Sequence, residues 1–320
     1  MQYFFQFKNE IMKQHQEATH VRFDWAIKRL LRNKANFVVL EGFLSELIGE
    51  NIIITNCLES EGNQKTKNDK YNRVDILVQN DEKELILIEV QNESEYDYFH
   101  RMLYGSSKLV TDYIKLGQKF GQIRKIISIN IVYFDLGQGN DYVYKAETEF
   151  YGIHNQQEIL QLSEIQKEHI KKETIAGIFP TYYLIKVNTF NDIAIDTLDE
   201  WIYFLKNSTI KKEFTAKGLK EADKIMSIDK MTTKQRKEYM RYMENLSYED
   251  SISTTKKIEQ EERENKLRKE SEEKGMKNKA KETTLKLLKK GMSNEEISEI
   301  TDLEISETEI LRHDVKDNKN

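Results

Sequence analysis

The sequence predicts an α/β domain with a mixed sheet, followed by a mostly helical C-terminal region. Two observations support this prediction. Between residues 20 and 135 the hydrophobic spacing changes in the order helix, strand, strand, strand, helix, strand, which is typical of an α/β domain. From Asp196 almost to the end, the sequence favours helix, beginning with an apolar stripe of Leu198, Trp201, Ile202 and Leu205 that should pack on the α/β domain. With 320 residues, the chain is long enough for about two domains.

Each element of the α/β domain follows from its own pattern. Apolar residues three and four apart indicate helices, whereas short apolar runs between polar turns indicate strands. The run 126–134 is apolar at nearly every position, which favours a central strand. The predicted elements are, in order, a helix over 20–50, strands beginning at 52 and covering 73–79 and 84–92, a helix over 96–116, and strands over 126–134, 141–153 and 181–187.

We expect the chain to be organised in four parts. These are an α/β domain (1–190), a helical extension packing on it (191–255), a charged helical arm or linker (256–282) and a small helix-turn-helix-like unit (283–320). Residues 256–290 contain 13 basic and 8 acidic residues with few apolar ones, which indicates a solvated helix or a flexible arm.

The small C-terminal unit has two possible helix starts. Ser293–Glu296 and Ser306–Glu309 both have the spacing of a capping box. Residues 292–312 contain seven acidic residues against the single basic Arg312, and acidic helices repel phosphate. A packing or dimerisation role is therefore favoured over base recognition, and a homodimer is one possible assembly.

Composition excludes several classes of protein. A net charge of −5 argues against a uniformly basic nucleic-acid coat protein. The single cysteine, Cys57, excludes a disulfide scaffold and a cysteine-rich zinc module. No apolar run approaches the roughly 18 residues that a membrane span needs, and the first residues lack the apolar core of a signal peptide. We therefore expect a cytoplasmic protein without membrane contact.

Polar residues interrupt two of the predicted strands. Asp75 lies in the second strand, and Glu89 and Gln91 lie near the end of the third. Because side chains alternate along a strand, Glu89 and Gln91 share one face. A carboxylate at the end of a strand that is buried on both faces is costly unless another group compensates it. One such group is Mg²⁺, held by Asp75, Glu89 and the carbonyl of Val90.

A purely structural interpretation of these carboxylates remains open. Asp75 could be a surface residue near a hairpin, and Glu89 could form a structural ion pair with Arg73 or Arg101. The spacing alone does not distinguish this arrangement from a metal site.

The element order, with Asp75 followed after thirteen residues by Glu89-Val90-Gln91, resembles the PD-(D/E)XK nuclease superfamily. More narrowly, the chain resembles the bacterial PD-(D/E)XK nuclease family transposases, relatives of the recombination-promoting nucleases. The likeness covers roughly residues 20–311 and rests on the segments 74–78, 88–91, 101–107, 127–131, 134–136, 198–205 and 290–293. It implies a restriction-endonuclease-like core with a mixed sheet flanked by helices.

The resemblance also implies a metal-dependent DNA endonuclease in transposition or recombination, with DNA as partner and Mg²⁺, replaceable by Mn²⁺, as cofactor. Asp75 and Glu89 would hold the metal, and Gln91 takes the place of the usual lysine. An additional glutamate from the first core helix would be Glu46, with Glu41 as second choice. Because glutamine is uncharged, Gln91 can orient water or phosphate but cannot stabilise negative charge as lysine would.

Four further residues are candidates for phosphate contact. Lys70, in the polar loop 61–71, and Arg73 both precede Asp75, and a basic loop that leads into a nuclease carboxylate could bind the DNA backbone. Arg101 and Tyr104 share a face of the next helix, from which they could reach the scissile phosphate or brace Glu89. A solvated loop and a helix-surface pair are the structural alternatives. The alternative function is an inactive nuclease fold that binds DNA or a protein partner.

Overall fold

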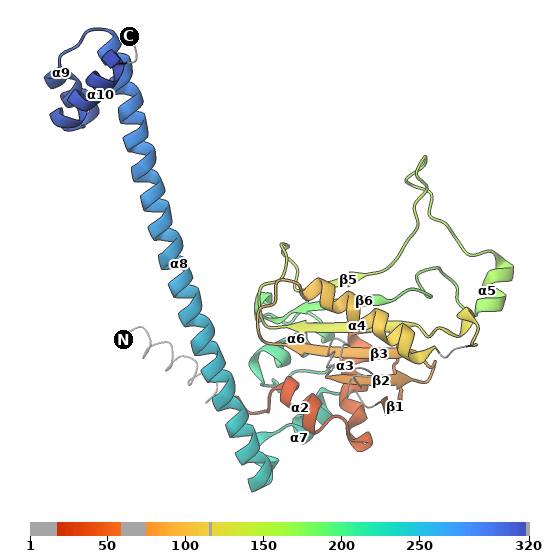
Figure 1. Cartoon of the computed structure of the whole chain (residues 1–320). Coiled ribbons are helices and arrows are strands. Elements are labelled where there is room, and N and C mark those ends of the chain that lie inside the picture. Colours follow the sequence, from red (N-terminus) through yellow and green to blue (C-terminus); the bar gives the residue numbers. More distant parts are fainter. Residues whose placement is uncertain (1–17, 59–74, 115–116, 318–320) are drawn as a thin grey trace. The chain divides into compact units, whose positions relative to one another are not determined.

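A computed structural model of the chain describes residues 18–58, 75–114 and 117–317 (Figure 1). The chain forms two compact units, Met1–Tyr242 and Met243–Asn320. The elements are, in order, α2 (Phe23–Arg29), η1 (Lys34–Asn36), α3 (Phe37–Ile48), β1 (Ile54–Leu58), β2 (Ile76–Asn80), β3 (Leu85–Gln91), α4 (Tyr98–Tyr113), η2 (Phe120–Gln122), β4 (Ile126–Val132), β5 (Val143–Ala146), α5 (Glu164–Ile170), β6 (Thr181–Lys186), η3 (Val187–Thr189), α6 (Thr197–Asn207), α7 (Leu219–Ile225), η4 (Ile228–Lys230), α8 (Thr233–Lys289), α9 (Asn294–Thr301) and α10 (Ile305–Asp317).

The first unit is built on a mixed six-stranded sheet with the order β1-β2-β3-β4-β6-β5. Strands β1, β2 and β3 pair antiparallel, whereas β3, β4 and β6 pair parallel. At the other edge, β5 pairs antiparallel with β6. Every residue of β4 is buried, as expected for a central strand. The predicted α/β fold with a mixed sheet and flanking helices is confirmed.

Helix α4 covers the face of the sheet to which Glu89 belongs. Leu85 and Leu87 of β3 pack with Leu109 of α4 in one hydrophobic cluster. Tyr98 and Met102, nearer the start of α4, belong to a second cluster. Figure 1 shows α4 lying across one face of the sheet. Because side chains alternate, Glu89 points to the same face as Leu85 and Leu87, toward the first turns of α4.

Aromatic side chains join the helices of the first unit. Trp201 of α6 is fully buried and contacts the rings of Phe23 in α2 and Phe43 in α3. Its indole Nε1 donates a hydrogen bond to the carbonyl oxygen of Lys217, just before α7. This cluster fixes α2 and α3 against the C-terminal part of the unit.

Two predicted elements differ from those observed. The single helix expected over 20–50 is broken into α2 and α3, because asparagine side chains take over backbone hydrogen bonds. Asn33 accepts from the peptide N–H of Ala35, and the Asn36 amide donates to the carbonyl of Leu30. The strand expected over 141–153 is reduced to β5, with Asp141 accepting from the N–H groups of Tyr142 and Val143.

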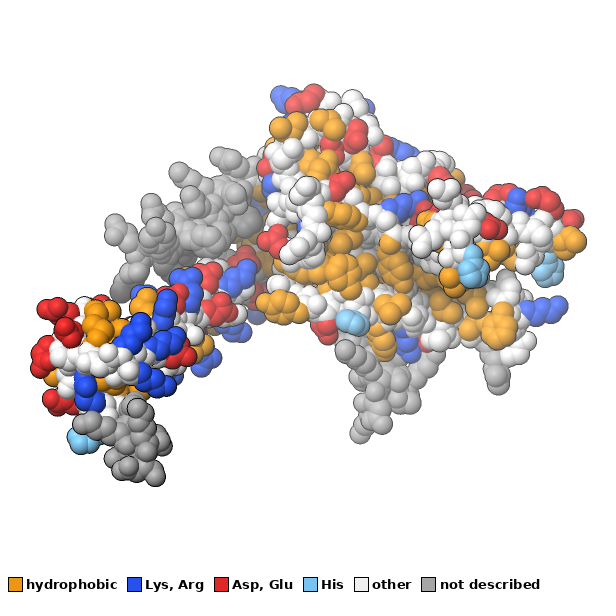
Figure 2. Space-filling model, turned by 90° about the horizontal axis from the view of Figure 1, so that it is seen from above, with side chains coloured by type: hydrophobic (Ala, Val, Ile, Leu, Met, Phe, Trp, Pro, Cys, Tyr) orange, Lys and Arg blue, Asp and Glu red, His pale blue; other side chains and the backbone are white. Residues whose placement is uncertain are grey.

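The second unit contains α8 from Met243 onward, together with α9 and α10. Leu288, Ile297 and Leu303 are its buried apolar residues in the described part. Ser293 forms the predicted capping box at α9. The second predicted box is wrong, because α10 begins at Ile305 and Ser306 lies inside the helix. Figure 2 shows acidic and basic side chains close together on the surface.

The charged segment 256–290 is helical as far as Lys289, the last residue of α8, and almost all of its side chains are exposed. Of the two forms expected for this segment, the solvated helix is therefore the one observed. Within the residues that the structure describes, no helix is both long and apolar enough to cross a membrane.

We expect Gly42→Ala to destabilise the first unit strongly. A Cβ at Gly42 would lie 2.2 Å from the carbonyl oxygen of Lys217 and 2.6 Å from the Cα of Gly218, both of them backbone atoms. Overpacking of this kind costs about 1–3 kcal/mol. Urea unfolding followed by tryptophan fluorescence measures the loss, since Trp25 and Trp201, the two tryptophans of the chain, lie in this unit.

Gly275→Ala in α8 is the matched control, because a Cβ there meets no atom within 4 Å. It should leave the tryptophan-detected transition unchanged. Equal stability of Gly42→Ala and the wild type would contradict the close contact between α3 and the residues before α7.

Candidate active site

The register of β2 and β3 brings Asp75 and Glu89 together. Ile76 pairs with Ile88 in this antiparallel ladder, so Asp75, just before β2, lies opposite Glu89 near the end of β3. Opposite residues of antiparallel strands share a face. The peptide N–H of Val90 donates a 2.8 Å hydrogen bond to Oδ2 of Asp75. Three residues predicted as metal ligands therefore meet at one end of the β2–β3 hairpin.

Glu89 is a buried carboxyl group without a hydrogen-bond partner among the described residues. The residue is 3% exposed, and both side-chain oxygens lack a donor there. Burial raises the pKa of Glu89 to about 7; the charge of Arg101 opposes this shift, and the charges of Asp75 and Glu95 add to it. A buried carboxylate in this state is costly unless a cation or a donor compensates it.

Arg101 of α4 lies between two carboxylates. Its Nε is 3.6 Å from Oε2 of Glu89, and its Nη1 donates a 3.0 Å hydrogen bond to Oε2 of Glu95. The structure thus contains the Glu89–Arg101 ion pair of the purely structural interpretation. The distance in that ion pair is too long for a hydrogen bond, so Arg101 does not act as a hydrogen-bond donor to the Glu89 oxygens. Tyr104, one turn further along α4, is half-buried.

Asp75 has cationic neighbours that sequence reasoning did not find. The Nζ of Lys28 lies 3.0 Å from Oδ1 of Asp75. Arg32 donates a 2.7 Å hydrogen bond from Nη2 to the main-chain carbonyl of Asp75. Both residues come from α2 and the turn after it. The sequence signal was present as a run of four basic residues, Lys28, Arg29, Arg32 and Lys34.

A buried polar network anchors α2 beside the end of β3. The carboxylate of Asp24 accepts hydrogen bonds from Arg22, Asn92 and the hydroxyl of Tyr242. Burial alone would raise the pKa of Asp24, but the charge of Arg22 and these hydrogen bonds together hold it below its ordinary value. Since Asn92 follows Gln91 directly, the network fixes α2 next to the candidate site. Sequence reasoning missed this network too.

The structure does not bring the predicted extra glutamate to the site. Glu46 accepts hydrogen bonds from Thr197 and from the N–H of Lys217, and Glu41 accepts from the N–H of Ile54. These contacts tie α3 to its neighbours, and within the described residues neither glutamate contacts Asp75 or Glu89.

The remaining predicted residues are only partly described. Gln91 donates from Nε2 to the carbonyl of Glu93 at 3.3 Å. Lys70 and Arg73 lie outside the described residues.

The donors present suit a hard divalent cation. Asp75 and Glu89 offer carboxylate oxygens, and the unsatisfied oxygens of Glu89 are the observation that fits a divalent cation. Among the described residues no group of three or more His, Cys, Asp or Glu side chains is arranged so that it could hold a metal ion. Further ligands would then be main-chain carbonyls and water, as is common for Mg²⁺.

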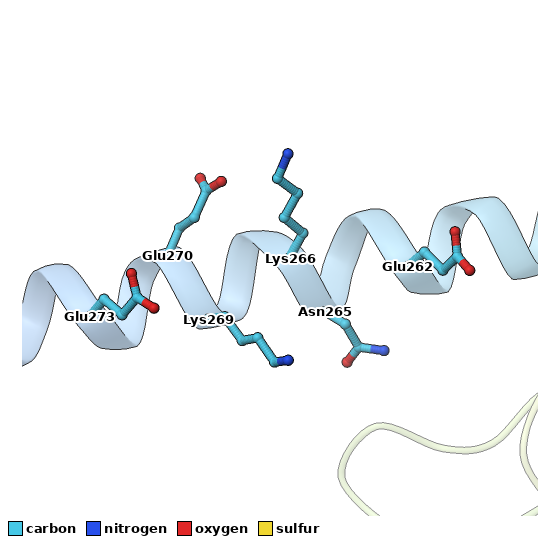
Figure 3. Close-up of a pocket in the computed structure, with 6 residues that line it drawn as sticks. All are labelled: Glu262, Asn265, Lys266, Lys269, Glu270 and Glu273. Carbon is cyan, nitrogen blue, oxygen red and sulfur yellow. The ribbon is translucent and has the colours of Figure 1, made fainter.

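A surface hollow on α8 is not a competing site. Its six lining residues all come from one exposed helix, and Figure 3 shows their side chains projecting from that helix in different directions. Lysine and glutamate side chains are mixed along it, which is the pattern of a solvated helix. The residues are Glu262, Asn265, Lys266, Lys269, Glu270 and Glu273.

Comparison with known families agrees with the fold. Residues 21–259 match the profile of the PD-(D/E)XK nuclease family transposases. The chain belongs to this family. A search of curated proteins and a search of solved structures each found no significant match. Membership associates the chain with nucleases that act on DNA in transposition, and the matched range contains Asp75, Glu89 and Gln91.

We expect Glu89→Gln to stabilise the metal-free protein at pH 8. In the folded state the pKa of Glu89 is about 7, above the ordinary glutamate value of 4.5, so folding favours the protonated form. Stability is therefore lost as the pH rises from about 4.5 through 7, and glutamine removes this loss. The gain should approach about 3 kcal/mol at pH 8 and shrink toward pH 5.

Urea unfolding at pH 5, 6, 7 and 8 in EDTA measures this difference. Asp81→Asn, in the turn at the opposite end of the β2–β3 hairpin, controls for loss of one negative charge. A stability difference between Glu89→Gln and the wild type that does not change with pH would contradict the raised pKa.

Proposed function

We propose that this protein is a metal-dependent DNA endonuclease that hydrolyses phosphodiester bonds in a transposition or recombination context. Mg²⁺ is the proposed cofactor, and Mn²⁺ can replace it. The observation that carries the proposal is the buried carboxyl of Glu89, without hydrogen-bond donors among the described residues, opposite Asp75 in a chain of a nuclease family. Such a group destabilises the fold unless a ligand compensates its charge.

In the proposed site, Asp75, Glu89 and the carbonyl of Val90 hold the cation. When bound, the cation supplies a more acidic water and stabilises charge on the phosphate oxygens. Glu89 must lose its proton to become a ligand, so binding is favoured above pH 7, the region of its pKa. Arg101 limits the cost of that ionisation through its charge. Gln91, being uncharged, is left to orient water or phosphate by hydrogen bonds.

We expect the wild type to nick supercoiled plasmid with Mg²⁺ or Mn²⁺ and to be inactive in EDTA. Asp75→Asn and Glu89→Gln should each lower the nicking rate more than about a hundredfold, because each removes a ligand of the group that stabilises developing charge. Asp81→Asn removes a carboxylate from the other end of the same hairpin and should nick at the wild-type rate.

The same assay separates the nuclease from an inactive relative that only binds DNA. The uncharged Gln91 is the feature that favours such a relative. Salt-sensitive DNA binding by folded wild type, with no metal-dependent nicking, would favour that alternative and overturn the proposed nuclease. Equal nicking by the wild type and both site variants would show that the site lies elsewhere.

A further inference from the structure

Because Gln91 is uncharged, the proposed site lacks the positive charge that a lysine would supply at this position. A nuclease site must balance the negative charge that builds on the attacked phosphate. Arg101 is already placed between Glu89 and Glu95, so two carboxylates draw on its charge. A cation that faces Asp75 and remains open to a substrate would serve better.

Lys28 meets both conditions. Its Nζ lies 3.0 Å from Oδ1 of Asp75, while about half of its side chain is exposed. An ammonium group has three donors on a flexible stem, so it can hold a carboxylate and a phosphate oxygen at once. An ion pair as exposed as this one contributes little to stability, so stabilisation of the fold does not account for Lys28 at this position.

Helix α2 holds Lys28 in place and adds positive charge around it. One turn before Lys28, Asp24 joins α2 to Asn92 beside the end of β3. One turn after it, Arg32 joins the chain to the main-chain carbonyl of Asp75. The seven residues from Lys28 to Lys34 carry four positive charges and no negative charge. Of these four residues, Lys28 and Arg32 contact Asp75, whereas Arg29 pairs with Glu238.

We propose that Lys28 binds the DNA phosphodiester that enters beside Asp75 and Glu89, and so supplies the positive charge that Gln91 lacks. The inference rests on the proposed nuclease function. It assigns to α2 a catalytic residue that lies far from Gln91 in the sequence. A divalent cation on Asp75 would compete with Lys28 for the same oxygen, so Lys28 is not needed to hold that cation.

The test compares Lys28→Met, Lys28→Arg and the control Arg29→Met. Arg29 is the next residue of α2, but its Nη1 pairs with Glu238 rather than with Asp75. Lys28→Met should nick plasmid about a hundredfold more slowly than the wild type, and Lys28→Arg should recover much of the rate. Arg29→Met should behave like the wild type.

Two readouts do not depend on cleavage. Titration calorimetry with Mn²⁺ should show that Lys28→Met binds the metal at least as tightly as the wild type. In EDTA, the slope of log affinity for DNA against log salt should fall by about 1 in Lys28→Met and remain in Lys28→Arg. A purely structural role predicts the opposite metal result, because a displaced Asp75 would bind Mn²⁺ more weakly.

Each failure points to one claim. If the wild type nicks and Lys28→Met nicks equally well, the role of Lys28 is overturned while the nuclease stands. Weaker Mn²⁺ binding by Lys28→Met, an equal loss in Arg29→Met, or no recovery in Lys28→Arg would also overturn it. If the folded wild type does not nick at all, the nuclease proposal fails, and the role of Lys28 falls with it.

Discussion

The burial of Glu89 at the end of β3 is the constraint on which the site depends. Strand β3 lies inside the sheet between β2 and β4, and six of its seven residues are buried. Its end carries a carboxyl group whose pKa is raised to about 7 by that burial. The charge of Asp75 adds to the cost of ionising Glu89, and the charge of Arg101 reduces it, so a further positive charge beside Asp75 and Glu89 would reduce that cost again.

The sheet and its helices divide the work of building this site. The antiparallel turn between β2 and β3 sets Asp75 opposite Glu89, and α4 brings Arg101 over the same face. Helix α2 approaches the pair with Lys28 and is held there by the network of Arg22, Asp24 and Asn92. Because that network is buried and its groups are hydrogen-bonded, it can fix α2 far more firmly than an exposed ion pair could.

Sequence patterns predicted what depends on local spacing. Strand alternation indicated that Glu89 and Gln91 share a face, whereas the resemblance to the nuclease family, rather than spacing alone, singled out Asp75, Glu89 and Arg101. Contacts between distant segments were not predictable in this way. Lys28 reaches Asp75 across 47 positions of the chain, and Tyr242 reaches Asp24 across 218. No periodicity reports such pairs.

The choice of Glu46 shows how one boundary affects a site prediction. Residues 20–50 have a continuous helical pattern, so a glutamate late in that pattern was the natural candidate for the first core helix. Asn36 donates to the carbonyl of Leu30, just after α2, and Asn33 caps η1, the short 3-10 helix before α3. The basic side chains Lys28 and Arg32, which contact Asp75, come from α2 and the turn after it, whereas Glu46 bonds to Thr197 and Lys217. Side-chain hydrogen bonds to the backbone broke the predicted helix in two, and hydrophobic spacing does not reveal such bonds.

The central claim is that Asp75 and Glu89 together bind a divalent cation. Its most direct test is anomalous diffraction from crystals of the protein soaked in Mn²⁺ at pH 8. The account predicts one anomalous peak within about 2.1 Å of a carboxylate oxygen from each of the two residues. A peak that does not involve Glu89, or the absence of a peak at the pair in crystals that bind Mn²⁺ elsewhere, would contradict it.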